Sequence, residues 1–395
     1  MPDTAPDPAP IRGDEGPGGE TAGRVGELGR LFLRLGVTAF GGPPAHIAMM
    51  HDEVVRRRAW VSDERFADLV GATNLIPGPN STELAIHLGW DRARARGLVV
   101  AGVCFIAPAA VIVTALAWLY VTYGDTPTLE GLLYGVKPVV VAIIAQALVK
   151  LVPTVAKTVL LGVFGAVALA AYLAGANELL VLAGAGALAA GLHAARTVRS
   201  SGSLSLWLPL PLAALAAPRD DVGLGALFLT FLRIGSVLYG SGYVLLAFLD
   251  GELVDRLGWI TERQLLDAVS IGQVTPGPVF TTATFVGYLT AGGCGAVVAT
   301  LGIFLPSFVF VALLTRLVGW MRSSPTLGAA LDGVNAAAIA LMVGVSLRLA
   351  GDAVVDPLTF AIAAAAGLAL WRTRVSSTWL IAAGAAVGVL QSVAT

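Results

Sequence analysis

Apolar residues form runs along this chain that are long enough to cross a membrane. Examples cover residues 98–120, 159–173, 296–314 and 358–371. A helical span needs roughly 20 apolar residues to cross a hydrocarbon core of about 30 Å. Of the 395 residues, 56% are hydrophobic and only 13% are charged, whereas a soluble domain carries about 25% charged residues. The pattern therefore predicts an all-α polytopic membrane protein.

The chain contains an internal duplication. At a shift of 199 residues, Phe32-Leu33-Arg34 aligns with Phe231-Leu232-Arg233, and Pro77-Gly78-Pro79 aligns with Pro276-Gly277-Pro278. After one deleted residue the shift becomes 198, which pairs Pro108 with Pro306. Such a sustained shift indicates two homologous halves. We expect a disordered tail at residues 1–24, a first repeat at 25–196, a linker at 197–221 and a second repeat at 222–395.

The tail is rich in proline, glycine and acidic residues and lacks an apolar core segment, so it is not expected to be a cleaved signal peptide. Basic residues orient the first half. If crossings lie at about 97–122, 129–149, 158–175 and 178–195, one side of the membrane receives Arg56, Arg57, Arg58, Arg65, Arg92, Arg94, Arg96, Lys150, Lys157, Arg196 and Arg199. The positive-inside rule assigns that side to the cytoplasm.

The matching loops of the second half have the opposite charge. They hold Asp250, Glu252, Asp255 and Glu262 against only Arg256 and Arg263. The second half is therefore expected to be inverted relative to the first, which an odd number of crossings, about five per half, would produce.

Proline and glycine break each half at the same place, within "NLIPGPNSTE" (residues 74–83) and "GQVTPGPVFTT" (residues 272–282). Before the first break, Ser62 is placed to cap a helical arm of about 15 residues, or roughly 22 Å. The arm after it supplies about 18 Å. Neither arm can span the membrane, so we predict a re-entrant helical hairpin in each half, with Pro77-Gly78-Pro79 and Pro276-Gly277-Pro278 at the tips. The alternative is that the motif merely kinks two long spans.

The hairpin tips are the first candidates for a binding site. A helix that begins there presents unpaired backbone N–H groups and a positive dipole end, which is a place where helices bind anions. Paired broken segments in inverted repeats also mark the substrate sites of transporters. Polar neighbours extend the candidate set to Asn74, Asn80, Ser81, Thr82, Glu83, Gln273, Thr281 and Thr282. The hydroxyl groups have a second interpretation, namely hydrogen bonds to their own backbone.

Glu83 is the one carboxylate of this set, because Thr282 stands at the matching position. An intramembrane carboxylate suggests function, for example as a proton carrier, although helix-start electrostatics explains it equally well. His87 either titrates in a useful range or is structural. Lys137, matched by Asn335, is a further candidate charge.

A second pair of breaks lies upstream of the hairpins, where "AFGGPPAH" (residues 39–46) aligns with "LYGSGYVL" (residues 238–245). Glycines there allow close backbone approach. The candidates are Gly41, Gly42, Pro43, His46, Gly240, Ser241 and Gly242. The preceding segments carry Arg34 and Arg233, whose forked donors either balance a dianion or reach out to the membrane interface.

Other chemistries lack their signatures in the sequence. The two cysteines, Cys104 and Cys294, do not occupy matching positions and imply neither a disulfide framework nor a metal cluster. No Walker-type phosphate loop, cofactor motif or coherent nucleophile set occurs. We therefore expect no metal, no cofactor, no nucleic-acid partner and no enzymatic activity.

The landmarks "FGGPPAH", Trp60, "IPGPNS" and "LGW", in this order and spacing, resemble the chromate ion transporter family in its long, two-domain form. The resemblance covers nearly all of the chain beyond about residue 25. It implies a bacterial inner-membrane protein with antiparallel halves that exports chromate, driven by the membrane potential or by ion gradients.

The second half departs from the family pattern, with Gly-Ser-Gly for Gly-Gly-Pro and Val279-Phe280 for Asn80-Ser81. We therefore expect the first half to contribute more to the site. The main hypothesis is a secondary transporter that exports chromate by alternating access between the two repeats. Transport of sulfate or another tetrahedral oxyanion, with chromate as a mimic, is the alternative within transport. A membrane-bound oxyanion-processing enzyme is the alternative of another class, and a homodimer stays open as the assembly state.

Overall fold

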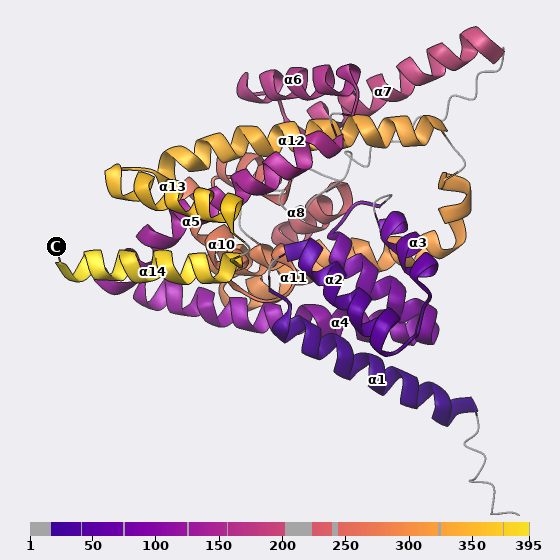
Figure 1. Cartoon of the computed structure of the whole chain (residues 1–395), viewed down its shortest axis with the longest axis horizontal. Coiled ribbons are helices and arrows are strands. Elements are labelled where there is room, and N and C mark those ends of the chain that lie inside the picture. Colours follow the sequence, from indigo (N-terminus) through magenta and orange to yellow (C-terminus); the bar gives the residue numbers. More distant parts are fainter. Residues whose placement is uncertain are drawn as a thin grey trace, which may run out of the picture.

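The computed structural model of the chain describes residues 17–40, 42–73, 76–124, 126–155, 157–201, 223–238, 244–322, 325–373 and 375–394 (Figure 1). Every regular element within these ranges is a helix. The first half comprises α1 (Pro17–Thr38), α2 (Gly42–His51), η1 (Asp52–Arg57), α3 (Asp63–Thr73), α4 (Asn80–Tyr123), α5 (Pro127–Val155), α6 (Val159–Leu173) and α7 (Glu178–Ser201). The second half repeats this order with α8 (Leu224–Val237), α9 (Leu245–Leu249), η4 (Asp250–Arg256), α10 (Glu262–Val274), η5 (Val279–Thr281), α11 (Thr282–Arg322), α12 (Pro325–Ala353), α13 (Pro357–Arg372) and α14 (Ser377–Ala394).

Five of these helices, α4, α5, α7, α11 and α12, are long and apolar enough to cross a membrane, judged by length and composition. Shorter apolar helices include α6, α8, α13 and α14. The long helices expose large apolar side chains, for example Val111 of α4, Leu180 of α7 and Leu301 of α11, as expected of a surface that faces lipid. The predicted all-α polytopic fold with two repeats is confirmed, and the four crossings expected in the first half coincide with the second part of α4 and with α5, α6 and α7.

The N-terminal helix begins earlier than the sequence suggested. α1 starts at Pro17, so residues 17–24 of the expected tail are helical, and residues 1–16 lie outside the described ranges. The cap predicted for the first hairpin arm is present, since Ser62 Oγ accepts a hydrogen bond of 3.2 Å from the Arg65 amide. The matching arm of the second half starts with a capping box between Thr261 and Gln264.

The helix after each tip folds back on itself. α4 loses helical geometry at Ala93 and Arg94, and α11 does so at Ala291 and Gly292. Past the break in α4 the chain runs antiparallel to the preceding arm, with Gly102 packed on Ile86 and Gly97 packed on Gly89. Because Gly89 and Gly97 have no side chains, the backbones of the two antiparallel segments touch at this point. Each half therefore contains a short helical hairpin followed by a long apolar helix, and its re-entry into the membrane stays a prediction.

The two halves interlock through their later helices. α5 packs against α13 and α14, while the matching α12 packs against α6 and α7 (Figure 1). Glycines bring these helices together, because Gly131 and Gly135 of α5 lie against Gly388 and Gly384 of α14. The first long helices of the two halves, α4 and α11, also contact one another. Each of these contacts between the halves is thus repeated by the matching elements with the halves exchanged, as an inverted repeat requires.

Candidate functional site

The tip of each hairpin is bound by the other half of the protein. The amide of Gly78 donates a 2.8 Å hydrogen bond to the carbonyl of Leu238, and the amide of Gly277 donates a 2.9 Å bond to the carbonyl of Ala39. Each carbonyl belongs to the residue that directly follows the first helix of a half, α1 or α8, and the two bonds are equivalent at a shift of 199 residues. The four broken segments of the chain therefore meet in the interior.

Both tip glycines occupy positions where a larger residue would not fit. Gly78 has φ of 136° and Gly277 has φ of 94°, in the region that favours glycine. A Cβ on Gly78 would overlap Glu83 and Ser307, and a Cβ on Gly277 would lie 2.7 Å from the Cβ of Ala109. Ser307 and Ala109 are themselves equivalent residues of α11 and α4 at a shift of 198.

The first tip carries buried polar atoms that have no hydrogen-bond partner within the described part of the chain. They are Oγ1 of Thr82, Oε2 of Glu83 and Nε2 of His87 on α4, and Nε2 of Gln273 on α10 is likewise unpartnered just before the second tip. Thr82 and Glu83 are fully buried. Because an unpaired buried polar atom is costly, such a group points to a ligand that the structure does not contain.

The second tip is different, since its hydroxyl groups bind their own backbone. Thr281 Oγ1 donates to the carbonyl of Pro278 and Thr282 Oγ1 donates to that of Val279, both at 2.8 Å. The threonine hydroxyl groups of the second tip are therefore satisfied by their own backbone, whereas the hydroxyl of Thr82 at the first tip is left for a ligand. Within the described residues, unpartnered buried side-chain atoms therefore occur in the first turn of α4 but not at the matching threonines of the second tip, although others lie elsewhere in the chain, for example on Thr230 and Asp250.

His46 links the two tips. Its Nε2 lies 3.0 Å from the carbonyl of Ala39, which also accepts the bond from Gly277, and its Nδ1 lies 3.3 Å from Ser81 Oγ. A carbonyl only accepts, so Nε2 carries the hydrogen and the neutral ring receives the Ser81 hydroxyl at Nδ1. The ring also packs edge-on against Phe105. His46 thereby holds the start of α4 at a fixed position relative to the second tip.

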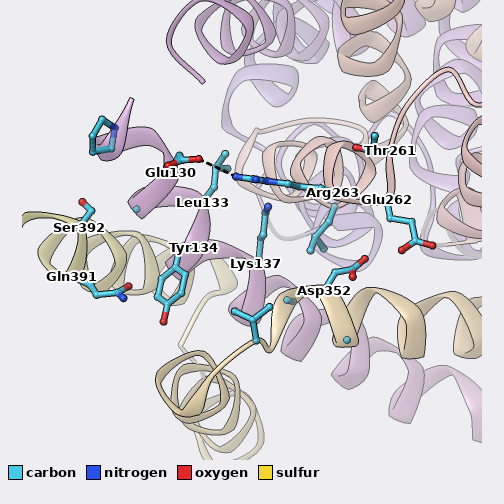
Figure 2. A pocket seen from close by; sticks show the side chains of 16 residues that line it. Glu130, Leu133, Tyr134, Lys137, Thr261, Glu262, Arg263, Asp352, Gln391 and Ser392 are labelled. Atoms are coloured by element: carbon cyan, nitrogen blue, oxygen red, sulfur yellow. Dashed lines mark hydrogen bonds and ion pairs between the residues drawn. The ribbon is translucent and has the colours of Figure 1, made fainter. Parts of the chain in front are cut away.

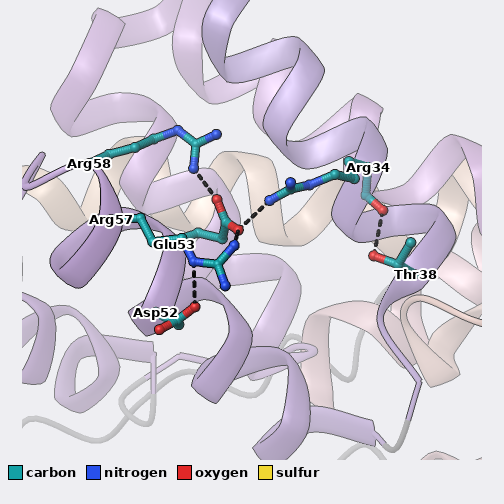
Figure 3. Close-up of polar contacts among 6 residues, drawn as sticks. All are labelled: Arg34, Thr38, Asp52, Glu53, Arg57 and Arg58. Carbon is teal, nitrogen blue, oxygen red and sulfur yellow. Dashed lines mark hydrogen bonds and ion pairs between the residues drawn. The ribbon is translucent and has the colours of Figure 1, made fainter.

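The two candidate arginines lie in matching clusters of ion pairs. In Figure 3, Arg34 and Arg58 both bind the carboxylate of Glu53, and Arg57 also binds it at 3.0 Å. In the second half, Arg233 and Arg256 bind Glu252 in the same way. Burial raises the pKa of Glu53, but the hydrogen bonds and charges of Arg58 and Arg34 outweigh this effect, and its pKa is lowered.

Lys137 pairs with a residue that the sequence did not single out as functional. Its Nζ lies 2.8 Å from Oδ1 of Asp267 on α10, and Tyr120 donates a 2.9 Å hydrogen bond to Oδ2 of the same carboxylate. Lys137 and Asp267 are both buried. The matching residue Asn335 is half-buried in α12. The pair joins the first half to the hairpin of the second.

A cavity of about 1040 Å³ lies beside this pair, between the starts of α5 and α10 and the ends of α12 and α14 (Figure 2). Lys137 lines it, and Arg263 bridges it by pairing with Glu130 at 3.3 Å. The carboxyl groups of Glu262 and Asp352 lie on its wall. This vestibule, as we name the cavity, is thus lined by three carboxyl groups and two cationic side chains.

Several predicted site residues remain to be placed. Pro77, Pro79 and Asn80 form the first tip, Pro276 and Pro278 form the second, and Gly42 and Pro43 begin α2. Gly41, Asn74, Gly240, Ser241 and Gly242 lie outside the described residues. Within those described, no group of three or more His, Cys, Asp or Glu side chains could hold a metal ion.

Sequence reasoning missed the groups that receive the tips. Ala39 and Leu238 act through backbone carbonyls, which leave no signature in side-chain identity. Ser307 is a polar side chain on the apolar helix α11, and that was the available signal, whereas Asp267 lies on α10 among other polar residues and gave none.

The profile of a family described as "Chromate transporter" matches residues 26–191 and 225–389. A chromate transport protein of Cupriavidus metallidurans is 34% identical over 367 residues, which cover 91% of each chain. A chromate transport protein of Pseudomonas aeruginosa is 32% identical and covers 92% of each chain. A probable chromate transport protein of Synechococcus elongatus is 30% identical over 92% of this chain and 95% of the relative. No solved structure matches the chain.

Proposed function

Because the chain belongs to the chromate transporter family, we propose that it is a secondary active transporter that exports chromate across the inner membrane. The relatives named above as chromate transport proteins match over nearly their whole length, which supports chromate as the substrate. The sequence holds no nucleotide-binding loop, so the membrane potential or an ion gradient supplies the energy.

The oxyanion binds at the first tip, between the two hairpins. The observation that carries this assignment is the set of buried, unpartnered polar atoms on Thr82, Glu83 and Gln273. Thr82 and Glu83 lie in the first turn of α4, which begins at Asn80 after Pro79 and has no side-chain cap, so the positive end of its dipole adds to the attraction. Arg34 and Arg233 stay in their ion pairs with Glu53 and Glu252, so their charge acts from a distance.

Charges at the two membrane faces favour export. The face assigned to the cytoplasm carries the arginines at and directly after the end of η1 and those at the bend in α4, and two of them, Arg58 and Arg92, stack on Trp60. The vestibule lies at the opposite ends of the helices and holds Glu130, Glu262 and Asp352. A basic entrance concentrates a dianion, whereas the vestibule, in which three carboxyl groups face Lys137 and Arg263, has no excess of positive charge to retain it. An inside-negative potential drives a dianion outward by about 4.6 kcal/mol per 100 mV.

The repeated contacts between the halves suit alternating access. The tips meet in the interior and are held by equivalent hydrogen bonds, from Gly78 to Leu238 and from Gly277 to Ala39. Rocking one half against the other would exchange the environments of the two hairpins around this centre. The vestibule lies beside the start of α10 in the second hairpin, and on this proposal the conformation is the outward-facing one.

Flux of chromate from liposomes that contain the purified protein tests the proposal. Thr82→Val should reduce the flux at least tenfold, because it removes an unpartnered hydroxyl from the site. Thr281→Val is the matched control and should have a smaller effect, since that hydroxyl binds its own backbone. Flux no greater than in protein-free liposomes, or equal effects of the two substitutions, would contradict the proposed function or site respectively.

Sulfate is the second candidate substrate, since chromate and sulfate share charge and shape. Competition of chromate flux by sulfate and by molybdate separates the two cases. Stronger inhibition by sulfate than by unlabelled chromate at equal concentration would make sulfate the principal substrate.

A further inference from the structure

Glu83 is a carboxylate in the position proposed for an anion. It is fully buried, and its Oε1 accepts a hydrogen bond of 3.4 Å from Ser307 Oγ. Its Oε2 has no partner, and the backbone of Gly78 packs against the carboxyl group. Within the described residues no lysine or arginine forms an ion pair with it.

The elements packed against this part of α4 bring it no balancing charge. α11 brings the Ser307 hydroxyl, whereas Asp267 of α10 contacts α4 at Tyr120, beyond the bend, and is held by Lys137. α2 brings His46, whose two ring nitrogens already contact Ser81 and Ala39. The short η5 (Val279–Thr281) holds no titratable group.

The charged contacts of α4 with α1 and α3 lie farther along the helix. Arg92 pairs with Glu27 of α1, and Asp91 pairs with Arg65 of α3. His87 follows Glu83 by one helical turn on the same α4 face, and its Nε2 is unpartnered. Of these groups, His87 is the one other titratable side chain near Glu83 that has an unsatisfied atom.

An ionised carboxylate is costly in such a place, because burial removes its hydration and no cation replaces it. Protonation turns Oε2 into a hydrogen-bond donor, which is what the oxygens of a tetrahedral anion need. Ionised Glu83 would instead repel the anion. The same geometry that disfavours the charged carboxylate thus makes the neutral acid a ligand.

We propose that Glu83 is the proton-binding site of the substrate pocket, and that one proton on Glu83 and one oxyanion occupy the pocket together. This inference rests on the proposed function and adds a proton to its bound state. The second tip has no part in proton binding, because Thr282 stands where the first tip has Glu83.

If the proton and the oxyanion bind together, the affinity of the protein for the oxyanion must depend on pH. If the anion binds only when Glu83 is protonated, the apparent affinity falls about tenfold per pH unit once the carboxyl ionises. Chromate itself also takes up a proton near neutral pH. That contribution is the same for every variant, so differences between variants report Glu83.

The test is equilibrium binding of radiolabelled chromate to the full-length protein in lipid nanodiscs across a pH series. Glu83→Gln should bind with an affinity within a few-fold of the wild type in acid and should lose the protein's share of the pH dependence. Glu64→Gln, which changes an exposed carboxylate of α3, is the matched control and should keep the wild-type profile.

Ser307→Ala provides a second variant with little risk to folding, because Ala109 already occupies the matching position of the first half. Removal of a donor to the carboxylate favours the neutral acid. The loss of affinity should therefore move to higher pH. An unchanged profile in this variant would overturn the inference even if Glu83→Gln does not fold.

The remaining outcomes are distinct. If wild type and Glu83→Gln bind chromate with the same pH dependence, the proposed function stands and the role of Glu83 is wrong. A pH dependence that survives in Glu83→Gln and disappears in His87→Gln assigns the proton to His87 and likewise overturns the inference. If the wild-type protein binds no chromate at any pH, the proposed function fails and the inference fails with it.

Discussion

The amide of Gly78 donates a 2.8 Å hydrogen bond to the carbonyl of Leu238, so the tip of the first hairpin is held by the second half of the chain. The equivalent bond joins Gly277 to Ala39. Neither hairpin can move without disturbing the opposite half. Both halves therefore contribute to the candidate site, and the positive φ and crowded surroundings of the two tip residues explain why they are glycines.

Substitution of a tip glycine should disrupt the site. Gly78→Ala forces a side chain into a backbone conformation that costs about 1–3 kcal/mol, and the new methyl group overlaps Glu83 and Ser307. We expect a clear drop in the thermal unfolding midpoint in detergent and loss of chromate flux. Gly162→Ala is the control, because its site in α6 is open and alanine favours a helix. An unchanged midpoint in Gly78→Ala would contradict the docking of the tip.

The buried pair of Lys137 and Asp267 should behave as a unit. Lys137→Ala leaves a buried carboxylate without its cation, which costs about 3–5 kcal/mol, and among the described residues the bond from Tyr120 is what remains to it. The double variant Lys137→Ala with Asp267→Ala should be less unstable than the two single effects added together. Lys150→Ala, at an exposed position of α5, should have little effect. Additive losses in this double-mutant cycle would show that the residues do not interact.

The bend in α4 contains a strained arginine. Arg94 has φ of 51°, and the matching bend of α11 uses Gly292 with φ of 61°. Arg94→Gly should therefore stabilise the protein by about 1 kcal/mol, measured as a rise in the unfolding midpoint. Arg96→Gly, which places glycine in a regular helical part of α4, should lower it. A loss of stability in Arg94→Gly would argue against strain at this bend.

The cluster around Glu53 should stabilise the fold in a pH-dependent way. The pKa of Glu53 is lowered in the folded protein, chiefly because hydrogen bonds from Arg58 and Arg34 outweigh the opposing effect of burial. Its contribution is therefore fully present above the pKa of the unfolded chain and is lost as the pH falls through the lowered, folded-state pKa. Glu53→Gln should be less stable than wild type at neutral pH, and the difference should shrink in acid. A difference that stays constant with pH would exclude ionisation of Glu53 as its cause.

Sequence patterns located most of the elements that build the site. The repeat alignment equated Gly78 with Gly277, and the Pro-Gly-Pro breaks marked where α3 and α10 end and the next helices begin. The cap at Ser62 followed from local side-chain chemistry. These features depend on neighbours in the chain or on a periodic comparison, and both are visible without coordinates.

The contacts between the halves could not be read in this way. The tips bind backbone carbonyls of Leu238 and Ala39, and any residue type offers a carbonyl. Asp267 reaches Lys137 only because α10 lies against α5. The placement of Arg34 and Arg233 had a sequence signal, because their partners Glu53 and Glu252 are also equivalent in the repeat. Matched charges of opposite sign at matched positions indicate an ion pair that both halves keep.

The most direct test of the central claim is to locate chromium in the structure of the full-length protein with bound chromate, by its anomalous scattering. The proposed function predicts a single strong peak at the first tip, close to Thr82 and Glu83 at the start of α4. A peak in the vestibule beside Lys137 and Arg263, with none at the tips, would contradict the assignment of the substrate site.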